Sequence, residues 1–205
     1  MGRRLTVYFS LLSPWAYIGH SELLRLAAKH ALALDFRPVA LMELFPETGG
    51  LPLPKRHPFR QAYRMVELQR WRDKRGLNFH LRPRFWPFDP TRADHVICAM
   101  AQEVDPSAFI ARAFAAIFEQ NRNMADDKEI TAALRESGDD PAWVLRAGTP
   151  EAAALYAANF SSAQAAGVFG SPSYLLDGEI FWGQDRLDLL DDALASGRAP
   201  FTVPA

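Results

Sequence analysis

The chain has 205 residues, of which 49% are apolar and 23% charged, and its formal net charge is −1. This apolar share suits one packed core, or one domain with a large insertion, and excludes a disordered chain. The near-neutral charge gives no general attraction to nucleic acid or acidic membranes. No apolar run approaches the roughly 18 residues of a membrane span, so we expect a soluble, cytoplasmic protein.

Cys98 is the only cysteine, which excludes an internal disulfide framework and fits a reducing compartment. It falls on the apolar face of a predicted helix, so we expect an inert core thiol. None of the five histidines has the spacing of a metal-ligand pair, and we expect no metal. The sequence also contains no phosphate loop and no dinucleotide fingerprint.

The N-terminal third predicts a strand, a helix and a second strand. Residues 5–9 are β-branched and aromatic, as in a buried strand. Ser13 then suits a helix N-cap and Pro14 the first helical position. A second strand is expected over residues 32–39. This order is typical of the start of an α/β domain.

The next hundred residues change character. A loop rich in Gly and Pro over 46–58 leads into segments whose apolar residues recur with helical spacing. The segments expected to be helical are 62–71, 93–100, 109–118, 132–134, 143–145 and 152–166.

The α/β pattern then resumes near the C-terminus. Residues 173–176 and 179–182 predict two strands joined by the hairpin turn Asp177-Gly178. Residues 183–186 are expected to begin a final helix, and residues 199–205 a tail. A helical module therefore interrupts a split α/β domain.

Four segments in this order, residues 8–15, 62–71, 167–172 and 181–187, together resemble 2-hydroxychromene-2-carboxylate isomerases and the related kappa-class glutathione transferases. Those proteins share a thioredoxin fold with an inserted helical domain, as do periplasmic disulfide oxidoreductases. The resemblance implies an α/β, thioredoxin-like fold with a large all-helical insertion. Its discontinuous thioredoxin-like domain would cover residues 1–45 and 166–205, and the inserted helical domain 46–165.

Ser13 stands where a thioredoxin-like protein carries the first cysteine of its dithiol, and Ala16 stands where the resolving cysteine would be. A dithiol oxidoreductase is therefore a poor interpretation. A hydroxyl at a helix N-terminus favours a thiolate over a thiol, because it donates a hydrogen bond beside unpaired backbone N–H groups. The resemblance makes Ser13 the catalytic residue, which binds and activates the sulfur of glutathione. The alternative is that Ser13 only caps the helix.

Two further segments are expected to bind glutathione. By resemblance, Pro172 follows a cis peptide bond, and Ser171 pairs through its backbone with the cysteinyl part of the tripeptide. Gly183, Gln184 and Asp185 would hold the γ-glutamyl end, with backbone groups on the carboxylate and the Asp185 side chain on the ammonium. The alternatives are an ordinary strand-leading proline and a plain helix cap, with Arg186 in an internal ion pair.

The acceptor site is expected near a basic stretch that contains Lys55, Arg56, His57, Arg60 and Arg64. By resemblance, Arg60 lies near a lysine position of the family and is the candidate to bind either the glycyl carboxylate of glutathione or an acidic substrate. Trp86 and Phe88 are candidates to cover an aromatic acceptor. A solvated surface and core packing are the alternatives for these residues.

The positions at which this sequence departs from the family pattern belong to the expected acceptor site. They are Ser10, Arg60-Gln61, the loop 47–51 and Asp89.

The resemblance predicts a glutathione-dependent isomerase that acts on a hydroxychromene carboxylate or a related aromatic-degradation intermediate. Reversible addition of a thiolate would permit ring opening and rotation, with glutathione as a cofactor. The partners would be a small aromatic carboxylate and a second copy of the chain in a homodimer, without nucleic acid or membrane. The alternatives are a kappa-class transferase or peroxidase, which consumes glutathione, and a binding module without catalysis.

Overall fold

The computed structural model describes residues 3–204, so Met1, Gly2 and Ala205 lie outside the described residues. Four strands form one mixed sheet in the order β2-β1-β3-β4. β1 and β2 run parallel, while β3 is antiparallel to both β1 and β4. The bounds are Arg4–Phe9 for β1, Ala33–Pro38 for β2, Ser173–Leu176 for β3 and Glu179–Trp182 for β4. The four predicted strands and the hairpin between β3 and β4 are thus confirmed.

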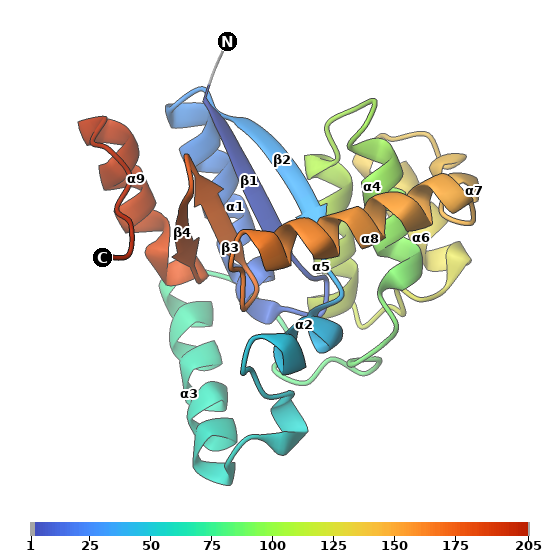
Figure 1. Ribbon diagram of the computed structural model, residues 1–205. Coiled ribbons are helices and arrows are strands. Elements are labelled where there is room, and N and C mark those ends of the chain that lie inside the picture. Colours follow the sequence, from blue (N-terminus) through green and yellow to red (C-terminus); the bar gives the residue numbers. More distant parts are fainter. Residues whose placement is uncertain (1–2, 205) are drawn as a thin grey trace.

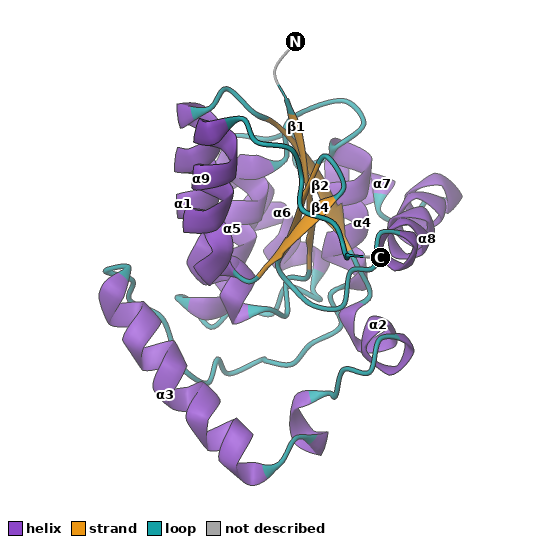
Figure 2. Ribbon diagram, turned by 60° about the vertical axis from the view of Figure 1, so that its left-hand side comes forward, coloured by secondary structure: helices purple, strands orange, loops and turns teal. Residues whose placement is uncertain are grey.

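Helices cover both faces of this sheet (Figure 2). α1 (Pro14–Lys29) links the two parallel strands and lies on one face beside α9 (Leu187–Ser196), while α8 (Pro150–Ala165) crosses the other face (Figure 1). Successive side chains of β1 point to opposite faces of the sheet, so this one strand contacts the helices on both sides. Val7 and Phe9 belong to the larger buried cluster with α1, and Tyr8 belongs to a smaller cluster with Val168.

Between β2 and β3 the chain is mainly helical, as predicted. The helices of this part that precede α8 are α2 (Leu41–Glu47), α3 (Pro58–Lys74), α4 (Thr91–Met100), α5 (Ser107–Phe118), α6 (Asp127–Ser137) and α7 (Trp143–Arg146).

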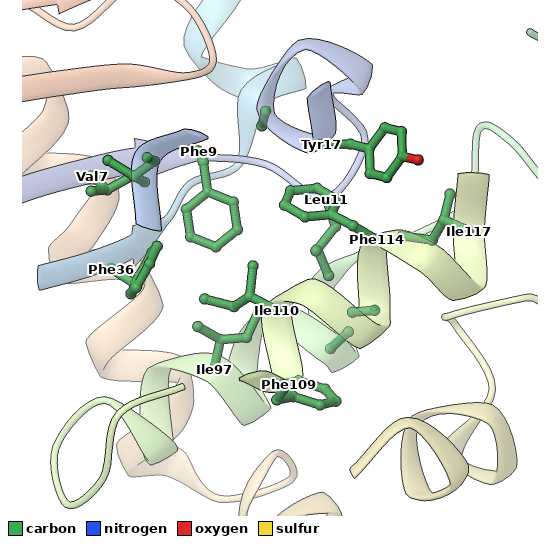
Figure 3. Close-up of a cluster of buried hydrophobic side chains, with 14 of the residues drawn as sticks. Val7, Phe9, Leu11, Tyr17, Phe36, Ile97, Phe109, Ile110, Phe114 and Ile117 are labelled. Atoms are coloured by element: carbon green, nitrogen blue, oxygen red, sulfur yellow. The ribbon is translucent and has the colours of Figure 1, made fainter. Parts of the chain in front are cut away.

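The inserted helices share a core with the sheet. Figure 3 shows side chains of β1, β2 and α1 facing those of α4 and α5. The Phe9 ring lies 5.9 Å from the Phe36 ring and 6.1 Å from the Phe114 ring, measured between centroids. Apolar burial therefore fixes α5 against the strand that leads to Ser13. The proposed boundaries, 1–45 with 166–205 and 46–165, stay predictions.

Two stretches differ from the expectations. The predicted loop 46–58 contains the end of α2, a 3₁₀ turn over Leu53–Lys55 and the start of α3. Two of its prolines, Pro54 and Pro58, stand at early helical positions that need no N–H donor, whereas Pro46 lies inside α2, one residue before its end. The final helix begins with a 3₁₀ turn over Gln184–Arg186, and α9 itself starts at Leu187. Within residues 3–204, none of the helices combines the length and apolar character needed to cross a bilayer.

His20 on α1 is a buried ionisable group in the contact with α5. It is 7% exposed, its ring packs against Phe36 and Phe114, and its Nε2 lies 3.3 Å from the carbonyl oxygen of Ser107. Burial lowers the pKa of His20 from 6.5 to about 4, although Ser107 and Asp105 act in the opposite direction. The folded protein therefore keeps this imidazole neutral at pH values where the unfolded chain protonates it.

We expect the free energy of unfolding to lose about 3 kcal/mol from this group as the pH falls from 6.5 to about 4. The unfolded chain takes up a proton there that the folded chain does not. His20→Gln keeps an N–H donor for Ser107 and should remove this part of the pH dependence. Chemical denaturation at a series of pH values measures it, and an unchanged slope in the variant would contradict the assignment.

Asp94 on α4 is buried without a cation. The Tyr156 hydroxyl donates to its Oδ2 over 3.1 Å, and its Oδ1 has no partner among the described residues. Burial raises the pKa of Asp94 well above the usual range, Asp89 adds to the rise, and the hydrogen bond from Tyr156 opposes it. The folded state thus favours the protonated carboxyl.

This group contributes stability that is complete at low pH and is lost as the pH rises toward the raised pKa. We therefore expect Asp94→Asn, a neutral isostere, to stabilise the protein progressively as the pH increases, with little effect in acid. Thermal melts of both proteins across the pH range give the comparison. A variant that is destabilised more at high pH than at low pH would show that the carboxylate is the favoured form.

Candidate active site

Ser13 sits in the turn between β1 and α1 and is the N-cap of that helix. Its hydroxyl accepts a hydrogen bond from the Ala16 N–H over 3.2 Å and donates one to the Ser171 carbonyl over 2.9 Å. The side chain is 4% exposed. Pro14 follows at a helical position where its missing N–H costs nothing. The residue therefore caps the helix, and in addition it contacts a segment 158 residues further along the chain.

The Ser171–Pro172 segment confirms the prediction of a cis peptide bond. The Ser171 hydroxyl accepts from the Ser10 N–H over 3.0 Å, so the two segments are held together by a second hydrogen bond. Among the described residues, the Ser171 N–H has no acceptor. The Pro172 carbonyl accepts from the Gly183 N–H over 2.9 Å, which attaches the third predicted segment to the second.

Gly183 has a φ of 103°, a conformation that favours glycine, and its Asp185 neighbour would lie 2.4 Å from an added Cβ. Asp185 is exposed and forms an ion pair with Arg186 over 2.9 Å, the alternative stated for that arginine. Gln184 is only 2% exposed. The structure thus brings Ser13, Ser171, Pro172 and the turn at Gly183 into one connected region.

Two residues that support this turn were not singled out from the sequence. A Cβ at Gly19 of α1 would lie 2.6 Å from the Gln184 Cβ, so the helix and the turn approach closely only because position 19 is glycine. A glycine inside a helical pattern is a signal that could have indicated such a contact. The Arg75 guanidinium, at the end of α3, donates to the Gln184 side-chain oxygen over 3.3 Å and pairs with Glu22.

An open cavity of about 400 Å³ lies beside the start of α1. Its lining comes mainly from the first half of α3 and from residues 79–86, with Pro14 and Phe118 also part of it. Figure 2 shows α3 set apart from the sheet, below α1 and α5. Ser13 itself is not part of this lining, but Pro14 follows it directly. The cavity therefore adjoins the connected region at the helix start.

Some of the predicted acceptor residues line this cavity and others do not. Trp86 lines it, and its Nε1 donates to the Leu12 carbonyl over 2.9 Å, next to Ser13. Phe88 is half-buried against the hydrophobic core and does not line the cavity. Arg60 is exposed and also lies outside the lining, whereas Arg64, one turn further along α3, belongs to it. The sequence indicated the basic stretch but not which arginine faces the cavity.

Other side chains that could bind a metal or react, such as the Cys98 thiol, lie outside this region. Cys98 is buried, as expected, and burial raises the pKa of its thiol. Residues 3–204 hold no group of three or more His, Cys, Asp or Glu side chains placed to bind a metal ion. With Ser13 and Ala16 at the start of α1, this helix offers a hydroxyl and a positive partial charge, not a thiol pair. The site can thus stabilise an anion that is brought to it.

Comparison with known proteins adds two kinds of similarity. The chain is 27% identical to a 2-hydroxychromene-2-carboxylate isomerase of Sphingobium xenophagum, over 95% of this chain and 99% of that protein. It is 26% identical to an isomerase of the same name from Pseudomonas putida, over 91% and 92% of the two chains. A solved structure of a 2-hydroxychromene-2-carboxylate isomerase superposes with a TM-score of 0.80 at 23% identity, covering 94% of this chain and 95% of that one.

The structural likeness confirms the predicted fold, a thioredoxin-like domain with a helical insertion. The model of one family matches residues 4–195, nearly the whole chain. The sheet order, the Ser13 helix and the cis bond before Pro172 lie within that range. The chain therefore belongs to the family of DSBA-like thioredoxin domains.

Proposed function

We propose that the protein is a glutathione-dependent isomerase of 2-hydroxychromene-2-carboxylate or a related aromatic-degradation intermediate. The names of its relatives support isomerase activity. The observation that carries the glutathione part is the hydrogen bond from the Ser13 hydroxyl to the Ser171 carbonyl. It places a helix-capping hydroxyl beside a backbone segment suited to an extended peptide.

The residues of the connected region suit the tripeptide. Ser171 offers an N–H and a carbonyl to the cysteinyl backbone. At the turn, the Arg186 N–H donates to the Gly183 carbonyl, and the N–H groups of Gln184 and Asp185 have no acceptor among the described residues. These two N–H groups suit a carboxylate, and the exposed Asp185 carboxylate suits an ammonium. One γ-glutamyl end carries both groups.

The Ser13 hydroxyl can donate one hydrogen bond, and in this structure it donates that bond to the Ser171 carbonyl. A peptide N–H that pairs with this carbonyl takes one of its two lone pairs and weakens the bond from Ser13. The Ser13 O–H is then free to turn and donate to a sulfur at the helix start, while Ala16 still donates to its oxygen. A charge-assisted hydrogen bond and the helix N-terminus together favour the thiolate. Peptide binding and activation of the hydroxyl are thereby coupled.

When bound, glutathione would supply a thiolate that adds reversibly to the conjugated substrate and is released unchanged. The protein's part is to position both molecules. The cavity beside Pro14 and Trp86 has apolar walls, including Leu68 and Phe79, that suit a planar ring. Trp86 is held by the Leu12 carbonyl, so the wall of the cavity and the Ser13 turn are fixed relative to each other.

Ser13→Ala should lower turnover about ten- to hundredfold, because it removes a hydrogen bond to a charged sulfur. Glutathione affinity should change much less, since Ser171 and the turn at Gly183 remain. Steady-state kinetics and calorimetric titration with glutathione give the two quantities. Glutathione should be unconsumed at the end of the reaction, whereas a transferase or peroxidase would consume it.

Two matched variants separate this role from helix capping. Ser13→Thr keeps both the cap and the hydroxyl, and it should keep most of the turnover. Thr149→Ala removes the equivalent cap of α8, where the Thr149 hydroxyl accepts from Ala152, and should cost only about 1 kcal/mol of stability. Normal turnover in Ser13→Ala would refute the catalytic role, and the absence of glutathione binding at millimolar concentration would favour a binding module.

A further inference from the structure

The cavity beside Ser13 carries an unbalanced positive charge. Arg64, His80 and Arg82 belong to its lining, and no aspartate or glutamate does. Two carboxylates adjoin lining residues in the sequence: Glu67, which precedes Leu68, pairs with Arg70, and Glu119, which follows Phe118, accepts the Tyr17 hydroxyl over 2.8 Å. Arg82 and His80 are exposed to solvent, whereas Arg64 is partly buried. Arg64 is therefore the cation whose charge water screens least.

Arg64 is held in place without a carboxylate partner. Its guanidinium carbon lies 5.5 Å from the centroid of the Trp86 ring, and its Nη1 lies 3.9 Å from the Met65 sulfur. Among residues 3–204, no acidic side chain forms an ion pair with it. Two neighbouring arginines differ, since Arg70 of α3 pairs with Glu67, and Arg75, which follows the helix, pairs with Glu22.

The environment of Arg64 determines its pKa and its preference for a bound anion. Burial lowers the pKa of Arg64 to about 10, and the charge of Arg56 adds to this effect. The guanidinium thus stays protonated near neutral pH, and an anion would relieve an unfavourable environment. Its fork of donors matches the two oxygens of a carboxylate, and its contact with the Trp86 ring takes up none of these N–H donors in an ion pair.

We propose that Arg64 is the specificity-determining residue for the carboxylate of a planar aromatic acceptor, which lies in the cavity between α3 and residues 79–86. The apolar lining, including Leu68 and Phe79, takes the ring, and Arg64 fixes its orientation with the reactive part toward Pro14 and Ser13. Arg60, the position indicated by the family pattern, does not perform this role because it is exposed outside the lining. This assignment of substrate class rests on the proposed function.

Binding of a stable probe tests the proposal without glutathione and without turnover. Chromone-2-carboxylate is a planar bicyclic carboxylate, and its carboxamide has nearly the same shape without the charge. In calorimetric titrations the wild-type protein should bind the carboxylate about ten- to hundredfold more tightly than the amide. Arg64→Met should lose this preference while still binding the amide. Arg64→Lys should keep the charge but only part of the preference, because it lacks the bidentate fork.

Arg70→Met is the matched control, since it makes the same change on the same helix at an exposed position, and it should keep the preference. Thermal melts check that each variant is folded. Equal binding of the two probes by the wild type, an equal loss of both in Arg64→Met, or loss of the preference in Arg60→Met instead would overturn the proposal. So would failure of the wild type to bind the carboxylate.

The test of Arg64 and the test of Ser13 can fail independently of each other. If Ser13→Ala retains full turnover while Arg64→Met loses the carboxylate preference, the cavity assignment stands and the role of Ser13 fails. If Ser13→Ala loses turnover but Arg64→Met keeps the preference, the assignment of Arg64 fails and the thiolate account stands.

Discussion

The hydrogen bond between the Ser13 hydroxyl and the Ser171 carbonyl joins segments 158 residues apart in the chain at the start of α1. Ser13 caps α1 because Ala16 donates to it, and Ser171 is held against Ser10 by a bond of its own. The two contacts with Ser171 depend on β1 and β3 being neighbours in the sheet. The sheet therefore positions the candidate site, although Ser13 itself lies outside its strands.

The inserted helices form the cavity that adjoins the contact between Ser13 and Ser171. α5 is fixed against β1 and α1 by the shared aromatic core (Figure 3), and α3 is fixed at its end by the contact of Arg75 with Gln184. Between these points, α3 and residues 79–86 form the cavity next to Pro14. Burial keeps His20 neutral where the unfolded chain is protonated and keeps Asp94 neutral where the unfolded chain is ionised, so stability falls in acid through His20 and falls toward higher pH through Asp94.

The sequence sufficed for the strands, for most helices and for the N-cap at Ser13, because these depend on local signals. Ser13-Pro14 is a capping pattern, and Asp177-Gly178 is a hairpin turn. The cis bond before Pro172 came from the family resemblance, since composition carries no such signal. The rest depended on tertiary packing. Which of Arg60 and Arg64 faces the cavity follows from how α3 lies on the protein, and the burial of Gln184 follows from its contact with Gly19.

Because Cys98 is the only cysteine and burial raises the pKa of its thiol, the protein adds no thiolate absorbance near neutral pH, and the difference from free glutathione alone reports on the bound tripeptide. The most direct measurement is therefore the thiol pKa of glutathione in complex with the protein, from thiolate absorbance across a pH titration. The account predicts a pKa below that of free glutathione, and a return toward the free value in Ser13→Ala. A bound thiol that titrates as it does in solution, in both proteins, would contradict it.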